Sequence, residues 1–410
     1  MKLLNKLFII ISASFVCLNM LSACEEEIQR PEVIEPLMPD KGPEGTGGSI
    51  GSAEITQTVV FQAGAGQEVF RIPSVVTAKD GSVIVFAEDR HRSWRDKSYT
   101  DVVCKRSTDN GVTWSAAVSI TGQLNQGGFA FMDPTPVVDK ETGKIFLFCT
   151  RWNELDTNPQ NNKAFMSVSS DNGVTWSTPQ DVSSQIIVPG MYSTGFGPGH
   201  GIQIATGKKA GRLVVITRQA PAGENAKNSG YAIYSDDHGQ TWTYGAATVG
   251  AEAQIAESGV DRLYMNVRKG GDRAAATSLD GGHSWNTALV DASLPFVEGG
   301  CEASVLGVGD NMVFYCGPEG GPTISGHDNR YNLKLFRSAV GGSSWSRSQV
   351  VYDKAAGYSD MTLLSDGKLA IIFEAGSEQG FIKATNRPAG WMRLDFLVLP
   401  ADITDYDYWF

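Results

Sequence analysis

The stretch Ser107-Thr108-Asp109-Asn110-Gly111-Val112-Thr113-Trp114 returns along the chain in the form Ser-x-Asp-x-Gly-x-Thr/Ser-Trp. Further copies occupy 169–176, 235–242 and 278–285, and a fifth at 338–345 lacks the aspartate. Successive copies begin 62, 66, 43 and 60 residues apart. Such a period is typical of a supersecondary unit that is repeated along the chain. The sequence therefore predicts an array of similar units.

The chemistry of this phrase, which we call the Asp box, is that of a hairpin turn. The carboxylate of Asp109 can accept backbone N–H groups of its own loop, and Gly111 supplies the positive φ of a tight turn. Trp114 can then bury its ring between neighbouring sheets. Apolar strand patterns such as 144–148 and 213–216 flank the boxes, and helical periodicity is almost absent. We predict an all-β fold, a six-bladed β-propeller of four-stranded antiparallel blades, at about 60 residues per blade.

Composition agrees with a large folded protein. Of 410 residues, 41% are hydrophobic and 19% charged, with 46 glycines and 17 prolines. These values exclude a disordered, collagen-like or multi-span membrane protein. The formal charge of −11 argues against a nucleic-acid partner, which would require clustered basic residues. We expect a monomer.

The N-terminus has the pattern of a targeting signal. A basic start is followed by an apolar run that is short for a membrane span, and the run ends in Leu21-Ser22-Ala23-Cys24. This end resembles a bacterial lipobox, in which cleavage leaves Cys24 as the lipid-bearing first residue. An ordinary secretory peptide is the alternative. We predict a signal peptide at 1–23, a lipidated Cys24 with a Pro/Gly/Ser-rich tether over 24–53, and a catalytic domain at 54–410.

The cysteines and histidines of the predicted catalytic domain do not indicate a metal site. Cys104, Cys149, Cys301 and Cys316 form no CxxC pair, and the five histidines are scattered. Cys301 and Cys316 flank a predicted hairpin, so a disulfide and two buried thiols both remain open. No metal and no organic cofactor is expected.

Phe70-Arg71-Ile72-Pro73 is more specific than the boxes. It looks like the FRIP signature of the sialidase (neuraminidase) family, and the resemblance covers about 55–410. It implies a six-bladed propeller that acts as an exo-α-sialidase on glycoproteins, glycolipids and sialyl-oligosaccharides.

Three arginines match the family's clamp for the sialic acid carboxylate: Arg71, Arg268 and Arg330, with Arg337 as a nearby competitor for the third. Planar guanidinium groups bind carboxylates bidentately and stay charged. Arg90 matches a further substrate-binding arginine. Glu374 matches the carboxylate that supports Arg71.

The resemblance also assigns the catalytic groups. Asp96, in the basic stretch 90–97, falls where the family places its acid/base, with Asp101 as the competitor. Tyr358 resembles the nucleophile. Glu252 matches the glutamate that takes the tyrosine's proton, and Glu257 is its neighbour in sequence.

The walls for the N-acetyl and glycerol groups are predicted from a loop that resembles the family's second blade. The candidates are Phe129, Phe131, Met132, Asp133 and Trp152.

We expect a membrane-anchored bacterial lipoprotein, facing the periplasm or the cell surface, that releases sialic acid with retention. Two alternatives remain: a trans-sialidase or anhydro-forming enzyme on the same scaffold, and a non-catalytic propeller that binds sialoglycans.

Overall fold

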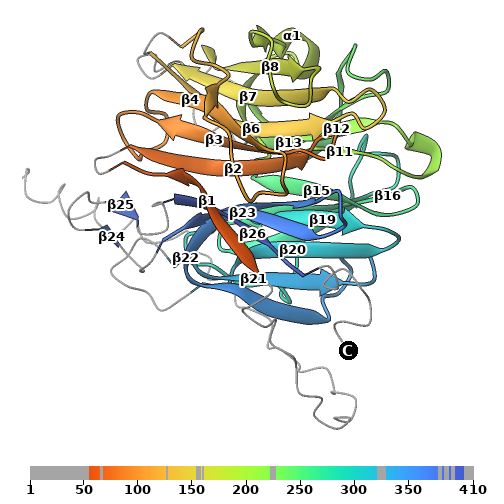
Figure 1. Cartoon of the computed structure of the whole chain (residues 1–410). Helices are drawn as coiled ribbons and strands as arrows, with labels where there is room; N and C mark the ends of the chain where they lie inside the picture. Colours follow the sequence, from red (N-terminus) through yellow and green to blue (C-terminus); the bar gives the residue numbers. More distant parts are fainter. Residues whose placement is uncertain are drawn as a thin grey trace, which may run out of the picture. The chain divides into compact units, whose positions relative to one another are not determined.

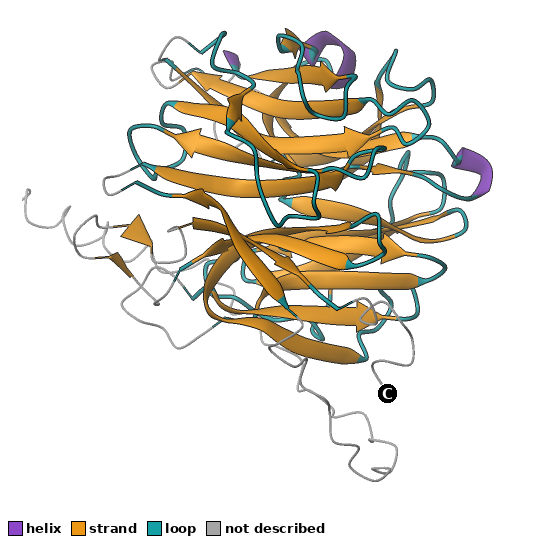
Figure 2. Cartoon of the chain, viewed as in Figure 1, coloured by secondary structure: helices purple, strands orange, loops and turns teal. Residues whose placement is uncertain are grey.

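The computed structural model describes residues 55–64, 68–125, 128–153, 158, 161–221, 228–320, 329–376, 381–382, 387–388 and 393–400. The predicted signal peptide, Cys24 and the tether lie outside them. Strands make up nearly all regular structure in the described part of the chain (Figure 2). No helix found there is long and apolar enough to cross a membrane.

The strands form consecutive antiparallel groups in chain order (Figure 1). The first group is β2 (Val69–Thr77), β3 (Val83–Arg90), β4 (Thr100–Ser107) and β5 (Val118–Ser119). The second is β6 (Phe129–Val138), β7 (Ile145–Asn153), β8 (Lys163–Ser169) and β9 (Gln180–Asp181). The third is β10 (Met191–Phe196), β11 (Ile202–Gln203), β12 (Leu213–Pro221), β13 (Ser229–Ser235) and β14 (Thr243–Val249). The fourth is β15 (Ala253–Gly259), β16 (Arg262–Lys269), β17 (Asp272–Ser278) and β18 (Leu289–Val290).

The last two groups share one long strand. The fifth group is β19 (Ser304–Val308), β20 (Met312–Pro318), β21 (Tyr331–Ser338) and the first half of β22 (Arg347–Leu363). The sixth group is the second half of β22, β23 (Leu369–Ala375), β26 (Arg393–Val398) and β1 (Thr56–Gln62). Outside the groups lie α1 (Ser183–Ile186), a 3₁₀ turn (Gly207–Lys209) and the pair β24 (Phe381–Ile382) and β25 (Arg387–Pro388). β1 therefore completes a group whose other strands come from the end of the chain (Figure 1).

Hydrophobic clusters lie between neighbouring groups and close a ring. Each cluster joins side chains from two successive groups, as in Phe86 with Phe131, Phe148 with Val215, Ile216 with Met265, Tyr264 with Tyr315, and Phe314 with Phe373. A sixth cluster joins Val85 of the first group to Ile372 of the last. Burial of each such side chain contributes about 1.5–3 kcal/mol. The predicted β-propeller is confirmed.

The Asp boxes are the turns that the sequence predicts. Asp171 accepts the Thr175 backbone N–H (2.9 Å) and Thr175 Oγ1 (2.6 Å), and Ser169 Oγ accepts the Gly173 N–H (2.9 Å). Gly173 has φ = +81°. The Trp176 ring packs edge-on against Phe86 of the preceding group, with centroids 5.4 Å apart. The tryptophan of each box thus packs at one interface between groups.

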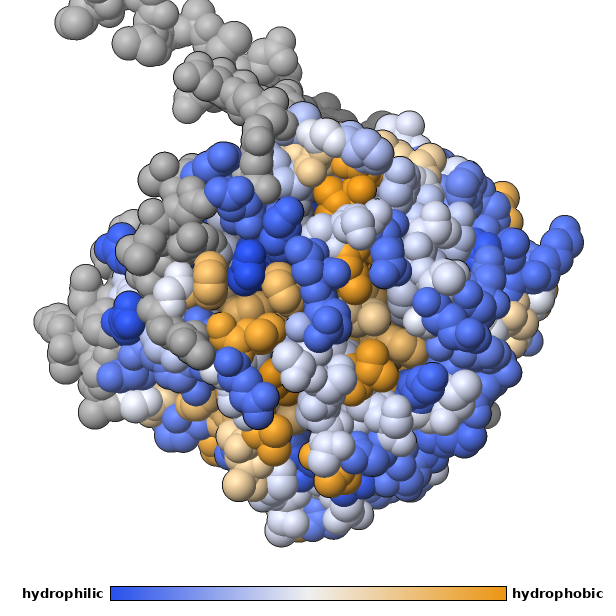
Figure 3. Space-filling model, turned by 90° about the horizontal axis from the view of Figure 1, so that it is seen from above, coloured by the Kyte–Doolittle hydropathy of each residue, from blue (hydrophilic) through white to orange (hydrophobic). Residues whose placement is uncertain are grey.

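The surface carries no single large hydrophobic face in the view of Figure 3, and the described cysteines are buried. On the face shown in Figure 3, hydrophobic side chains appear as scattered areas among hydrophilic ones. Cys104, Cys149, Cys301 and Cys316 are all buried and free, so the open question of the Cys301–Cys316 pair is answered in favour of thiols.

Candidate active site

The predicted site residues converge at one end of the inner strands. Arg71 lies near the start of β2, and Glu252 directly precedes β15. Arg330 directly precedes β21, and Tyr358 lies in the second half of β22. Glu374 lies near the end of β23, which runs antiparallel to β22. One end of the ring therefore collects side chains that are far apart in sequence.

Tyr358 and Glu252 form the centre of the site. The Tyr358 hydroxyl donates a hydrogen bond to Glu252 Oε1 at 2.5 Å. Arg268 Nη1 donates to Glu252 Oε2 at 2.7 Å and to the Tyr358 oxygen at 2.9 Å. The tyrosine is only 5% exposed. A phenol, a carboxylate and a guanidinium thus share one small, largely buried network.

The charges around this pair set its resting protonation state. Burial raises the pKa of Glu252, but Arg268 and Arg218 outweigh it and hold that pKa below its usual value. Burial and then the Glu252 charge raise the pKa of Tyr358 well above its usual value, against the opposing effect of the arginines. Glu252 is therefore an ionised base that faces a protonated phenol.

The three predicted clamp arginines surround the same tyrosine. The Cζ atoms of Arg71 and Arg330 lie 5.3 Å and 5.1 Å from the centre of the Tyr358 ring, and Arg268 contacts the hydroxyl. The competitor Arg337 is buried near the far end of β21, seven residues on. At about 3.3 Å per residue of strand, that is roughly 20 Å away. Arg330 is the arginine that the fold brings to the site.

Glu374 joins the clamp to the nucleophile segment. Its two oxygens accept Arg71 Nε at 2.8 Å and Nη2 at 2.9 Å, and they also accept the backbone N–H groups of Ile72 (3.1 Å) and Tyr358 (3.2 Å). Ile72 has φ = +54°, which is strained for a β-branched residue. The predicted support of Arg71 by Glu374 is therefore present, and it fixes the backbone on both sides of the site.

Asp96 lies beside two arginines on the loop that follows β3. Its Oδ1 is 2.8 Å from Arg90 Nη1 and 4.0 Å from Arg71 Nη1, and its side chain is 65% exposed. Desolvation raises the pKa of Asp96, but Arg90 and Arg71 outweigh this and lower it overall. In the free protein, Arg90 therefore positions Asp96. This role of Arg90 is additional to its predicted contact with substrate.

The two competing carboxylates have structural roles. Asp101 is buried and accepts hydrogen bonds from Asn125 Nδ2 (2.9 Å) and Thr121 Oγ1 (3.1 Å). Glu257 accepts the backbone N–H groups of Ala205 (2.7 Å) and Thr206 (2.9 Å) at the other end of β15. Neither carboxylate contacts the cluster around Tyr358, and Asp96 and Glu252 remain the predicted catalytic carboxylates.

Of the predicted pocket walls, Asp133 and Trp152 contact other charged residues of the site, whereas Phe131 belongs to the hydrophobic core. Asp133 Oδ2 pairs with Arg218 Nη2 at 2.6 Å, and burial raises the pKa of Asp133 to about 7 although Arg218 opposes this. Trp152 lies against the Asp96 loop, because Lys97 Nζ is 4.1 Å from its ring centre. Phe129 stacks with the guanidinium of Arg151. Met132 is buried, and Phe131 belongs to the core between the first two groups.

Two charged residues of the site were not predicted. Glu88 accepts Arg90 Nη2 at 2.6 Å and the Asp133 backbone N–H at 2.8 Å, and Arg218 holds Asp133. Both follow apolar strand segments, 83–87 and 213–216. A charged residue at the end of a buried strand is the signal that could have identified them.

Comparisons with known proteins give the same family. The family profile described as a BNR repeat-like domain matches residues 100–371. The sialidase of Micromonospora viridifaciens is 29% identical over 350 residues, 79% of this chain and 52% of the relative. The sialidase of Bacteroides fragilis is 30% identical over 338 residues, 75% of this chain and 60% of the relative. The chain thus spans about half to three fifths of these relatives.

A solved structure agrees at the level of fold. The Hadza microbial sialidase Hz136 superimposes with a TM-score of 0.71 at 24% identity, covering 85% of this chain and 69% of that protein. The profile match and the curated sialidase relatives place the chain in the BNR-repeat sialidase family.

Proposed function

We propose that the protein is a retaining exo-α-sialidase that removes terminal sialic acid from glycoproteins, glycolipids and sialyl-oligosaccharides. The observation that carries this proposal is the 2.5 Å contact between Tyr358 and Glu252 inside a ring of three arginines. A sugar carboxylate that replaces solvent beside Arg71, Arg268 and Arg330 would have its charge matched by planar donors. A sugar bound in this way would have its anomeric carbon near the Tyr358 phenol, because that carbon carries the carboxylate.

The reaction proceeds in two displacements. In the first, the Tyr358 oxygen attacks the anomeric carbon while its proton passes to Glu252, and Asp96 protonates the departing glycosidic oxygen. The product is a covalent sialyl-tyrosine. In the second, Asp96 accepts a proton from water, the water attacks the anomeric carbon, and Glu252 returns the proton to Tyr358. Two inversions give net retention.

A tyrosine suits this substrate better than a carboxylate would. Sialic acid carries its carboxylate on the anomeric carbon, so an anionic nucleophile would be repelled as it approaches. A neutral phenol becomes nucleophilic only as Glu252 removes its proton, and sialidases are known to depart in this way from the rule of two carboxylates. The lowered pKa of Glu252 keeps the base ionised for that step.

Product analysis tests the proposal directly. Purified protein incubated with sialyllactose should release free sialic acid and lactose, and Tyr358→Phe should release neither. A 2,7-anhydro product, or transfer to added lactose without hydrolysis, would instead assign the intramolecular or trans-sialidase activity. Binding of sialyllactose without any product would assign a sialoglycan-binding propeller.

We also propose that Cys24 carries lipid and holds the catalytic domain on a bacterial membrane, facing the periplasm or the exterior. The support is the sequence Leu21-Ser22-Ala23-Cys24 at the end of an apolar run.

A further inference from the structure

A cavity of about 360 Å³ lies at the opposite ends of the inner strands from the candidate active site. β2 passes from Arg71 to Thr77, which lines the cavity, and β22 passes from Tyr358 to Met361 and Thr362, which also line it. The other walls come from four further strands and the residues next to them, namely β6, β11, β15 and β19. All six groups of strands therefore surround a hollow that the proposed reaction does not use.

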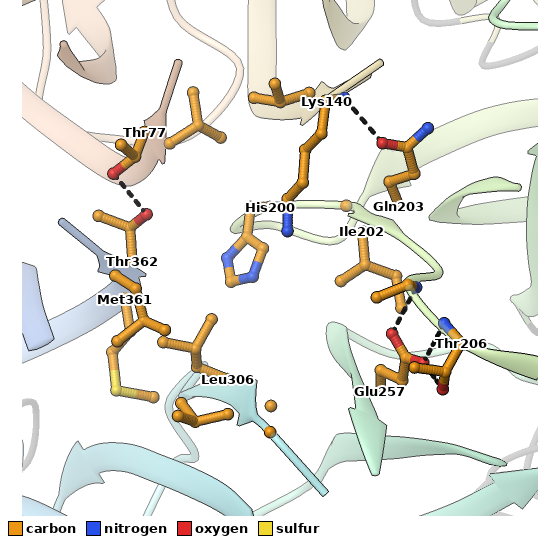
Figure 4. A pocket seen from close by; sticks show the side chains of 18 of the residues that line it. Thr77, Lys140, His200, Ile202, Gln203, Thr206, Glu257, Leu306, Met361 and Thr362 are labelled. Atoms are coloured by element: carbon orange, nitrogen blue, oxygen red, sulfur yellow. Dashed lines mark hydrogen bonds between the residues drawn. The ribbon is translucent and has the colours of Figure 1, made fainter. Parts of the chain in front are cut away.

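His200 presents an unsatisfied nitrogen to this cavity. Its Nδ1 lies 2.7 Å from Asp360 Oδ1, and Asp360 is fully buried and also accepts the backbone N–H groups of Val75 (2.9 Å) and Met361 (3.0 Å). These contacts fix the ring, which is only 9% exposed and points into the hollow (Figure 4). Its Nε2 is buried and has no hydrogen-bond partner among the described residues. A buried imidazole nitrogen without a partner favours a ligand that supplies one.

Lys140 brings a positive charge to the same place. It follows β6, its backbone N–H donates to Gln203 Oε1 at 2.7 Å, and its side chain extends toward His200 in Figure 4. No ion pair involves Lys140 within the described part of the chain. Because His200 Nδ1–H is donated to Asp360, Nε2 is a donor only in the protonated ring. A carboxylate that accepts from both Lys140 Nζ and Nε2 in this region of the cavity therefore binds together with one proton.

The acidic residues of the cavity lie elsewhere on its wall. Both oxygens of Glu257 are engaged by Ala205 and Thr206, at 2.7 Å and 2.9 Å from the two backbone nitrogens, on the side away from Lys140 (Figure 4). Asp310 is exposed at the turn between β19 and β20. The positive and negative groups are thus separated across the hollow.

The rest of the lining is largely apolar. Val75, Val138, Leu306, Val308, Met361 and Leu363 contribute to it. A volume of about 360 Å³ is at the small end of the range for small-molecule sites, and such sites combine apolar walls with a few convergent polar groups. We propose that this cavity binds a small monocarboxylic acid with a hydrophobic body. Its carboxylate lies between Lys140 Nζ and His200 Nε2, and its body covers the apolar wall.

Calorimetric titration of the full chain with octanoate tests the site. We expect saturable binding that weakens about tenfold or more in Lys140→Met and in His200→Gln, because each variant removes one carboxylate partner. Lys144→Met, on the adjoining hairpin and outside the cavity lining, is the matched control and should bind as the wild type does. Octanol, which lacks the carboxylate, should bind at least tenfold more weakly.

No saturable binding of octanoate would overturn the proposal, and so would equal affinity in Lys140→Met and the wild type. Lys140 is exposed, so its replacement keeps the test decisive even if His200→Gln fails to fold. The arginine clamp also binds carboxylates, so the titration is repeated with Arg330→Ala. Unchanged binding there supports the cavity, and lost binding would place octanoate in the active site instead.

Discussion

At the scale of single residues, the same carboxylate chemistry serves opposite purposes in different surroundings. Asp101 is surrounded by Asn125 and Thr121 donors and is committed to its loop. Asp96 lies beside the guanidinium groups of Arg90 and Arg71, and 65% of its side chain is exposed. Accessibility and partners, rather than residue type, distinguish the proposed acid Asp96 from the structural Asp101.

The role of Asp96 predicts a dependence on the leaving group. Asp96→Ala should lose about 10²–10⁴-fold in kcat/KM on sialyllactose, because a sugar hydroxyl must be protonated to depart. A nitrophenyl sialoside has a good leaving group and should be largely spared. Tyr358→Phe is the control that should impair both substrates. Equal losses of Asp96→Ala on the two substrates would contradict the acid role and leave Asp96 as a positioning residue.

The lowered pKa of Asp96 predicts the sign of the pH dependence. The acid must carry a proton, and Arg90 and Arg71 hold its pKa below the ordinary 3.8 in the free protein. The protonated fraction therefore falls about tenfold for each pH unit above that value. We expect kcat/KM for sialyllactose to decline as pH rises from 5 to 7, while kcat/KM for the nitrophenyl sialoside changes much less. A flat profile for sialyllactose would show that the arginines do not control this proton.

Arg330 should contribute through the substrate carboxylate. Removing one partner of a desolvated ion pair costs roughly 3–5 kcal/mol, so Arg330→Ala should lower kcat/KM by about 10²–10³-fold or more. Arg330→Lys keeps the charge without the planar guanidinium group, so its kcat/KM should lie between those of the wild type and Arg330→Ala. Thermal unfolding of each variant serves as the control for folding. Near-normal kinetics of Arg330→Ala would remove it from the clamp.

Sequence could identify these residues only where a phrase carried the signal. The phrase around Arg71 and the segment around Tyr358 match family motifs, and the fold brings these two residues together. The choice of Arg330 over Arg337 required the strand that separates them, because both lie within one short segment. Glu88 and Arg218 carry no motif, and their contacts with Arg90 and Asp133 depend on strands brought together only by the fold.

At the scale of elements, the Asp box is a turn whose stability resides in one carboxylate. The aspartates of the four complete copies have pKa values below the ordinary 3.8, because hydrogen bonds from the threonine or serine of each box outweigh the effect of burial, which raises the pKa. An aspartate whose pKa is lower in the folded than in the unfolded protein stabilises the fold at pH values above its unfolded pKa. This stabilisation is lost as the pH falls through the folded-state pKa, which is about 2 for Asp109. The boxes therefore contribute to acid sensitivity between about pH 4 and 2.

The incomplete fifth box provides an internal test. Val340 stands where the other copies have aspartate, yet Gly342 still donates to Ser338 Oγ at 2.9 Å and has φ = +81°. Val340→Asp should therefore gain the bonds to Ser344 and raise the free energy of unfolding by about 0.5–1.5 kcal/mol. Asp171→Val should lower it by a similar amount. Urea unfolding measures both, and kcat/KM should stay unchanged; a destabilised Val340→Asp would contradict this account of the turn.

The repeat predicted the propeller because turn chemistry is local. The long strand β22, shared by two groups, was not predicted, and neither was the pairing of β1 with β26. Both depend on contacts between segments that are distant in sequence, and no short pattern records such contacts. For the same reason, the cavity beside His200 could not be predicted from the sequence.

At the scale of the whole molecule, the ring is closed by its first strand. β1 pairs with β26 and places Val60 and Phe61 in the cluster that joins the first and last groups. The proposed tether over 24–53 directly precedes this strand. The strand that closes the ring is thus also the one that follows the proposed lipid anchor in the sequence. The anchor and the active-site residues therefore belong to separate parts of the chain.

That separation makes the proposed anchor testable without disturbing catalysis. Cys24→Ser removes the thiol that would carry the acyl chains, which stabilise membrane attachment by about 0.8 kcal/mol per buried CH₂. We expect the variant to move from the membrane fraction to the soluble fraction after cell lysis, with kcat/KM on sialyllactose unchanged. Ser22→Thr, which leaves the cysteine in place, is the control for altered processing. Wild-type protein found already in the soluble fraction would contradict lipid attachment at Cys24 and favour an ordinary secretory signal.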